Sequence, residues 1–223
     1  MSDVHFYEMK SGHGLSHDPF KAIVAPRPIG WISTQSPDGH VNLAPYSFFN
    51  ALGENPHIVG FSSYGYKDSV TNVEKTKEFV FNLATRELAE KVNITSFVAP
   101  YGINEMQLAG LEPAPCRLVK APRVRDSPAS FECRLLSVTH LHDMDGNPTK
   151  SYLVLGQVIG VHIQRKFVTP EGLFDTAAAC PIGRCGYLSD YAEVNHLFHM
   201  RRPADDNPEL VEAVKQLSEE NKQ

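Results

Sequence analysis

Between residues 23 and 162 the apolar residues occur in short runs that end at Gly, Pro, Asp or Asn, and this pattern constrains the fold most. Short apolar runs bounded by turn-forming residues are typical of β-strands, because an amphipathic helix needs a longer stretch with a period of about 3.6 residues. We expect strands over residues 29–36, 47–51, 58–62, 79–84, 131–140 and 151–163, with a further strand starting at Val41. The sequence therefore predicts a β-rich body with several antiparallel pairs.

Two turn signals support this interpretation. The Asp38-Gly39 pair follows Pro37 and separates two of the expected strands, and both residues tolerate the positive φ of a tight hairpin. Residues 143–148, Asp-Met-Asp-Gly-Asn-Pro, separate the last two expected strands in the same way. Each signal predicts an antiparallel hairpin.

Three helices are expected among and after the strands. Residues 67–77 place Val70 and Val73 one turn apart, with Asp68 or Ser69 available as N-cap. Residues 86–98 show a weaker apolar face without proline. A terminal helix begins at Asn207 and Pro208, and its apolar side consists of Leu210, Val211, Val214 and Leu217. We expect this amphipathic helix to dock on the body or on a partner subunit.

The size of the chain fits one large domain. It has 223 residues, 42% of them hydrophobic, and shows no internal repeat and no change of composition before about residue 204. We therefore expect one domain over residues 1–203 and a C-terminal helical extension over residues 204–223.

Charge and cysteine content exclude several classes of protein. The net charge is −5 without a dense basic run, so no nucleic-acid partner is expected. The longest nearly apolar stretch, residues 153–161, is much shorter than the roughly 20 residues of a membrane-spanning helix. The N-terminus lacks the pattern of a secretion signal, and the four cysteines form no C-x-x-C pair. A cytoplasmic protein with reduced cysteines is expected.

A segment suited to phosphate binding spans residues 61–72, where a strand passes through a glycine loop into a helix start. Hydroxyl groups are offered by Ser62, Ser63 and Ser69, and Lys67 adds a positive charge to the helix N-terminus. The alternative is that the serines and Asp68 only cap the helix.

A second polar segment spans residues 42–50. Asn42, Pro45 and Ser47 occur where a strand would be apolar. We therefore expect some backbone groups of this strand to face a ligand instead of a neighbouring strand. It follows residues 26–34, which contain the only tryptophan, Trp31. The alternative is an irregular edge strand, with Trp31 in the ordinary core.

Four motifs in this order resemble one known family. RPIGWIST, NLAPYSFFN, FSSYGYKDSVTN and FVFNL, supported by residues 180–187, are similar to the flavin reductase family of FMN-binding split-barrel proteins, which includes flavoredoxin. The resemblance covers roughly residues 18–190. It implies a mainly β fold, a split Greek-key β-barrel with helical insertions and a C-terminal helix, in which residues 1–203 form the FMN-binding domain. It also implies a homodimer with FMN near the subunit interface.

The resemblance implies roles for individual residues. Trp31, Ser33 and Thr34 would lie beside the flavin and its ribityl chain, Asn42, Ala44, Pro45, Tyr46 and Ser47 along the ring edge, and Ser62, Ser63, Lys67 and Ser69 at the phosphate. Asn82 would lie on the next strand of this wall, with Arg27 and Asn72 as further candidates. His162 is the candidate catalytic residue beside the cofactor or nicotinamide slot, and a purely structural role is its alternative.

The activity expected from the resemblance is the NAD(P)H-dependent reduction of flavin, with electrons passed to a flavin or to a protein such as a monooxygenase. No Gly-x-Gly-x-x-Gly motif is present, so NADH or NADPH would bind without a Rossmann fold. Two alternatives stay open: an FMN electron carrier that does not turn over nicotinamide, and a non-redox flavin-binding module.

No metal site is expected. His196 and His199, three residues apart, would need a helix and further ligands to bind an ion, and no carboxylate or cysteine pattern completes such a site.

Overall fold

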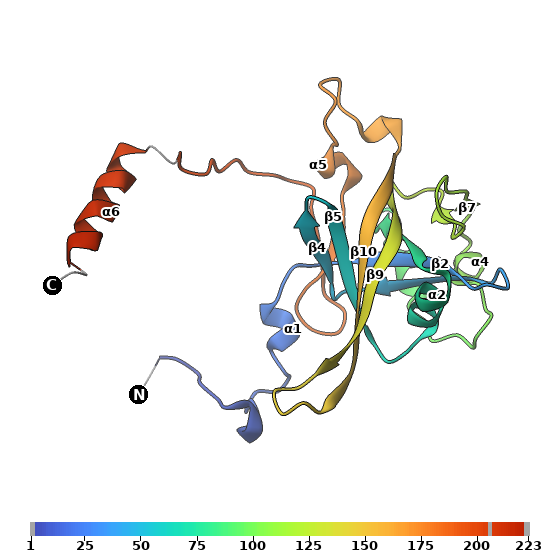
Figure 1. Ribbon diagram of the computed structural model, residues 1–223, viewed down its shortest axis with the longest axis horizontal. Coiled ribbons are helices and arrows are strands. Elements are labelled where there is room, and N and C mark those ends of the chain that lie inside the picture. The colour runs from blue at the N-terminus through green and yellow to red at the C-terminus, as the bar shows by residue number, and fades with distance from the viewer. Residues whose placement is uncertain (1–2, 205–206, 221–223) are drawn as a thin grey trace.

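The centre of the protein is one seven-stranded antiparallel sheet. The structure is a computed structural model that describes residues 3–204 and 207–220. The strands lie in the order β3-β2-β6-β9-β10-β5-β4 (Figure 1). Their bounds are β2 Gly30–Gln35, β3 Val41–Tyr46, β4 Phe49–Glu54, β5 His57–Tyr64, β6 Glu78–Leu83, β9 Ala129–His142 and β10 Pro148–Ile163. The predicted β-rich body is confirmed.

The two predicted hairpins are also confirmed. β2 pairs with β3 across the Asp38-Gly39 turn, where Gly39 has φ +90° and its N–H donates to the Ser36 carbonyl at 3.0 Å. β9 and β10 are joined by the second turn, in which Gly146 has φ +82°. These two long strands form a ribbon that runs through the whole body (Figure 1).

The smaller elements escape prediction from sequence because they are only a few residues long. There are two minor sheets among the described residues. One consists of β1 Arg27–Pro28, β11 Ile182–Arg184 and β12 Tyr191–Glu193, and the other of β7 Pro113–Ala114 and β8 Arg123–Val124. The short helices are η1 Met9–Ser11, α1 Phe20–Ile23, α4 Glu105–Leu108, η2 Arg165–Phe167 and α5 Thr176–Ala179. Strands of two or three residues show no periodicity, so tertiary pairing defines them.

The longer helices match the expectations unequally. α2 spans Asp68–Thr76 and buries Val70 and Val73 against the sheet, as predicted. α3 spans only Ala89–Ile94, so the helix expected over 86–98 is too long. At its end the Thr95 hydroxyl donates to the Val92 carbonyl at 2.9 Å and accepts a hydrogen bond from the Trp31 indole N–H. These two bonds favour a turn at Thr95 over a further helical residue.

One strand is displaced from its predicted position. β4 covers Phe49–Glu54, whereas residues 47–51 were expected. Residues 47 and 48 form a bend between β3 and β4, and the chain resumes its pairing with β5 at Phe49↔Phe61. The pairing partner therefore shifts the strand toward the C-terminus.

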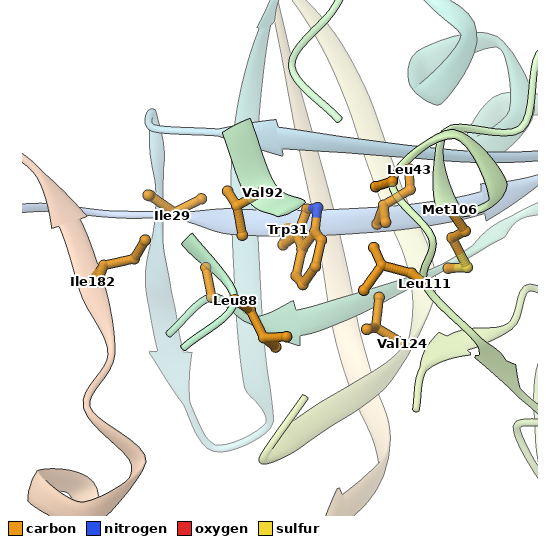
Figure 2. Packing of buried hydrophobic residues seen from close by; sticks show 11 residues of the cluster. Ile29, Trp31, Leu43, Leu88, Val92, Met106, Leu111, Val124 and Ile182 are labelled. Carbon is orange, nitrogen blue, oxygen red and sulfur yellow. The ribbon is translucent and has the colours of Figure 1, made fainter. Parts of the chain in front are cut away.

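The core has two main hydrophobic clusters. One gathers around Phe61, Phe79 and Val154 between the strands and α2. The other surrounds Trp31, which is completely buried among Val92, Leu111 and other apolar side chains (Figure 2). Trp31 is therefore a core residue, which is the alternative stated for it above.

The last helix, α6 Pro208–Glu220, stands away from the barrel at the end of an extended segment (Figure 1). Its apolar residues remain exposed, with Val214 at 64% and Leu217 at 58%. The expected docking on the body of the same chain is not made. In the described part of the chain, no helix is long and apolar enough to cross a membrane.

Candidate functional site

A cavity of about 250 Å³ lies between β3, the start of α2 and the segment 95–105. Six residues expected at a cofactor site line it: Asn42, Ala44, Pro45, Tyr46, Lys67 and Ser69. The opposite wall is formed by residues 95–99, Tyr101 and Glu105. The structure thus brings together the polar strand and the helix start, which lie more than 20 residues apart in the sequence.

The start of α2 faces this cavity without a side-chain cap. Lys67 occupies the N-cap position in an extended conformation, and no side chain accepts a hydrogen bond from the first turn. The alternative in which the serines and Asp68 only cap the helix is therefore wrong. Lys67 is exposed and Ser69 is 1% exposed, and both line the cavity. The positive end of the helix dipole, an ammonium group and a hydroxyl group favour an anion here, and the Asp68 carboxylate, which lines the same cavity, opposes it.

Hydrogen bonds hold the polar wall in place. The Asn42 side-chain amide donates to the Ser69 hydroxyl at 2.9 Å. Burial raises the pKa of Tyr46 above its ordinary value, and the nearby hydroxyl groups of Ser69 and Ser63 oppose this shift. The phenol therefore stays protonated at neutral pH.

Thr34 and Asn72 support this wall from behind. The Thr34 hydroxyl oxygen accepts hydrogen bonds from the Asn72 amide at 3.1 Å and from the Asn42 amide at 3.5 Å. Thr34 is completely buried and Asn72 is 2% exposed. Their position sets the orientation of Asn42, and neither residue lines the cavity.

Ser62 and Ser63 lie near the expected phosphate position without lining the cavity. Ser63 is completely buried and its hydroxyl donates to the Gly65 carbonyl at 2.8 Å. The backbone N–H of Ser62 donates to the Phe48 carbonyl. Both serines therefore hold the loop that leads to Lys67.

Glu105 is a residue of this site that the sequence reasoning missed. It is 6% exposed, lines the cavity, and its Oε2 accepts a 3.0 Å hydrogen bond from the Leu43 N–H of β3. Burial raises the pKa of this carboxyl, and the bond from Leu43 opposes the shift. The Asn104 side chain caps α4 and so fixes Glu105. Asn104 followed by Glu105 was the available signal, a common start of a helix.

Two aromatic side chains of the opposite wall are open to solvent. Phe97 is 66% exposed and Tyr101 is 60% exposed, although both line the cavity. Apolar rings left uncovered at the mouth of a polar cavity offer a stacking surface to a planar ligand.

Trp31, Ser33 and Asn82 have their side chains in the interior. The Trp31 indole N–H donates to the Thr95 hydroxyl at 2.9 Å. Asn82 donates to the Trp31 carbonyl and the Ser33 hydroxyl, and its Oδ1 accepts bonds from the Val124 N–H and the Ser130 hydroxyl. This network connects three strands to β8, and none of the three residues lines the cavity.

Arg27 and Ser47 do not line this cavity. Arg27 is 6% exposed and its Nη1 donates to the carbonyls of Lys21 and Val24, which orders the entry to β1. Ser47 lines a smaller cavity of about 150 Å³ together with Pro45 and Arg184. Because Pro45 lines both cavities, they adjoin each other.

His162 lies elsewhere, in a separate cavity of about 670 Å³ that shares no lining residue with the first. Its Nε2 is 2.6 Å from the Glu132 carboxylate. β10 directs this side chain toward β9 and away from the cavity beside β3, and its expected catalytic role stays a prediction.

The histidine pair considered for a metal forms no site in the described chain, where one other group of possible ligands is present. His196 and His199 lie in an extended segment, so the helical spacing considered for a metal is absent. All four cysteines are free. Among the described residues, Cys116, Glu132 and His162 form one group whose possible metal-ligand atoms lie within 4.8 Å of one another.

Comparison with known proteins agrees with this architecture. Nitrilotriacetate monooxygenase component B from Bacillus cereus superposes with a TM-score of 0.78 at 24% identity, over 89% of this chain and 100% of that chain. Flavoredoxin of Desulfovibrio vulgaris (Miyazaki F) gives 0.70 at 16% identity, over 79% and 91%. At these identities the likeness shows the fold, and the split barrel is confirmed.

Sequence comparison places the chain in a family. An uncharacterised protein of Aquifex aeolicus (strain VF5) is 37% identical over 179 residues, which cover 77% of this chain and 88% of that protein. Residues 24–182 match the flavin reductase like domain, which supports a flavin as the class of cofactor. The match spans the sheet, α2 and the whole cavity, so the chain belongs to the flavin reductase like domain family.

Proposed function

We propose that the cavity binds FMN and that the protein is an NAD(P)H-dependent flavin reductase, which passes electrons to a flavin or to a protein acceptor. The observation that carries this proposal is the uncapped start of α2, where Lys67 and Ser69 face the same cavity as the polar wall of β3. Membership of the flavin reductase like family supports it.

The phosphate would lie at the start of α2. A phosphate monoester carries about −1.5 to −2 charges at neutral pH, and it meets backbone N–H groups, the Lys67 ammonium and the Ser69 hydroxyl here. Ser62 and Ser63 would contribute indirectly, by fixing the loop before Lys67. The Ser63 hydroxyl already donates to the Gly65 carbonyl.

The ring system would lie along β3. β3 is an edge strand of the sheet, so its outer backbone groups have no neighbouring strand. Pro45 lacks an N–H and lines both adjoining cavities, so an extended planar ligand would run along β3 past Pro45 from one cavity into the other. This arrangement explains why polar residues and a proline interrupt a strand that would otherwise be apolar.

Flavin supplies the redox chemistry when bound, since it accepts a hydride and passes the electrons on. The residues of the chain bind and orient it. Phe97 and Tyr101 form an exposed wall on which nicotinamide can approach the ring, and Glu105 and Tyr46 are protonatable groups next to it. All strand pairs among the described residues are antiparallel, so they form no Rossmann unit and the donor would be held by this wall.

The test has two steps. The purified protein is denatured and the supernatant is chromatographed for FMN, and the folded protein is then mixed anaerobically with NADH or NADPH while flavin absorbance is followed. We expect bound FMN and bleaching by at least one nucleotide. Protein that neither contains FMN nor binds it at micromolar concentrations contradicts the proposal.

A specific fold likeness favours one alternative, an electron carrier. The structure of a flavoredoxin shares this fold, as does component B of a monooxygenase, whose name suggests an oxygenase partner. Bleaching by dithionite without bleaching by NADH or NADPH would support the carrier. Flavin binding without any reduction would support a non-redox module.

A further inference from the structure

The cavity that contains His162 collects positive charge on a protein with net charge −5. It measures about 670 Å³ and is lined by three arginines, Arg117, Arg123 and Arg125, in addition to His162 and Gln164. The three arginines lie within nine residues of one another in the sequence. No lining residue is shared with the proposed FMN cavity, so any ligand of this cavity is a separate one.

Two of these guanidinium groups have no acidic partner. Arg125 pairs with exposed Glu112 at 3.3 Å, whereas Arg117 and Arg123 form no ion pair with any residue in the described ranges. The Nε of Arg123 is buried and has no hydrogen-bond acceptor. A buried donor without a partner is costly, so the described residues alone do not satisfy the Arg123 guanidinium.

The one carboxylate in the lining is already satisfied. Glu132 is 1% exposed, and its oxygens accept hydrogen bonds from the backbone N–H groups of residues 117–119 and from His162. These bonds account for the acceptor capacity of the carboxylate. In the described chain Glu132 pairs with His162, and with neither Arg117 nor Arg123.

The cavity is held in shape before any ligand binds. The backbone N–H of Arg117 is fixed by Glu132 at 2.9 Å, and that of Val124, next to Arg123, is fixed by Asn82 at 2.8 Å. The Gln164 amide donates to the carbonyls of Arg125 and Ser127. Side chains that are positioned on fixed backbone lose less entropy when a ligand binds.

A metal is the competing occupant, because Cys116, Glu132 and His162 have their ligand atoms within 4.8 Å. Three features disfavour a cation. Glu132 has its acceptor positions filled, the pKa of the Cys116 thiol is raised to about 12 by burial and by Glu132, and the arginines repel positive charge. These features favour an anionic ligand.

We propose that this cavity binds a phosphate-bearing small molecule with at least two negative charges, such as a diphosphate, held mainly by Arg117 and Arg123. Guanidinium groups bind phosphate oxygens in a bidentate manner. Two unpaired guanidinium groups therefore suit a ligand with two negative charges better than they suit a ligand with one carboxylate. The cavity is large enough for a group beyond the phosphate, since ligand pockets commonly measure about 300–1,000 Å³. The inference does not depend on FMN binding.

The test is a calorimetric titration of flavin-saturated protein with inorganic pyrophosphate at low ionic strength. We expect saturable binding that Arg117→Gln and Arg123→Gln each weaken by about tenfold or more. Arg86→Gln is the matched control, because Arg86 pairs with Glu193 and lines no part of this cavity, and it should leave the affinity unchanged.

Several results would overturn the proposal. They are the absence of saturable binding, equal weakening by all three substitutions, or displacement of the bound flavin by pyrophosphate, which would assign the binding to the first cavity. Equal affinity for succinate would refute the preference for phosphate. Zinc uptake that is lost in Cys116→Ser would replace the anion by a metal.

Discussion

The Asn42 side-chain amide donates a 2.9 Å hydrogen bond to the Ser69 hydroxyl and so ties the edge strand β3 to the first turn of α2. Both residues line the same cavity, and Asn42 is itself supported by Thr34. This bond sets the distance between the polar wall and the helix start. In the proposed binding mode, a ligand with a phosphate at one end and a flat ring system at the other would span these two elements.

The first prediction concerns Lys67. Lys67→Ala should weaken FMN binding by about tenfold, the lower end of the range for a charge-assisted hydrogen bond, because this lysine is exposed and water screens its charge. Fluorescence titration with FMN measures the effect. Riboflavin, which lacks the phosphate, serves as the control ligand and should be affected much less. Equal weakening of both ligands would show that Lys67 does not contact the phosphate.

The sequence predicted the elements with local signals and missed those defined by distant partners. Both hairpins have an Asp-Gly or Gly-Asn turn, and α2 has an amphipathic pattern, so their positions follow from nearby residues. β11 and β12 are short strands that exist only because β1 lies beside β11. Their sequence therefore carries little information about them.

The same distinction applies to the site. The wall of β3 was recognisable because Asn42 and Pro45 break the apolar pattern. Trp31 could not be assigned, since a strand gives no indication of which face meets the core until the neighbouring helix α3 is placed. Glu105 was missed because its partner, the Leu43 N–H, lies 62 residues away. The cavity that contains His162 was not foreseen for the corresponding reason, since its partner Glu132 lies on another strand, and the expected role of His162 stays a prediction.

The second prediction concerns Glu105. Its raised pKa means that the folded protein binds this proton more tightly than the unfolded chain, so stability falls as the pH rises from about 4.3 through the raised pKa. Glu105→Gln removes this fall and retains an acceptor for the Leu43 N–H. The variant should therefore gain stability relative to the parent as pH increases, in urea unfolding between pH 4 and pH 8. A stability difference that is constant with pH would contradict the assignment.

The third prediction concerns Glu132. Burial opposes its ionisation. Hydrogen bonds from the backbone N–H groups of residues 117–119 and from the His162 side chain outweigh burial and lower the pKa of Glu132. Its contribution to stability is therefore present above the unfolded pKa of about 4.3 and is lost as the pH falls through the lowered value. Glu132→Gln places an amide N–H against backbone donors and should cost roughly 1 to 3 kcal/mol at neutral pH.

Denaturant unfolding measures this loss, and Glu112→Gln provides the control, since Glu112 is an exposed carboxylate that pairs only with Arg125. The cost of Glu132→Gln should shrink at acid pH, where the parent carboxylate is itself protonated. A cost as small as that of the control at neutral pH would show that the buried bonds contribute little.

The fourth prediction concerns the subunit arrangement. The apolar side of α6 is uncovered in a single chain, with Leu210, Val214 and Leu217 each at least 48% exposed, so we expect it to be covered by a second subunit. Light scattering should give about twice the 24.8 kDa of one chain. Truncation after Pro203 should lower the stability of the dimer and leave the barrel folded. A mass of one chain over a wide concentration range would refute the dimer.

The last prediction concerns hydride transfer. If nicotinamide stacks on a ring held along β3, the reacting atoms must approach to about 3 to 3.5 Å, and a bulky side chain on the opposite wall would prevent this. Ala99 is half-buried on that wall and next to the open rings, so Ala99→Trp should slow flavin bleaching by NADH or NADPH by at least about tenfold, while FMN affinity changes little. His162→Trp is the matched control, because the same indole then enters the other cavity, and it should bleach as fast as the parent. Stopped-flow absorbance under anaerobic conditions measures both variants. Slowing by His162→Trp alone would place the nicotinamide slot in the arginine-lined cavity, whereas a parent that bleaches only with dithionite would leave the electron carrier as the function.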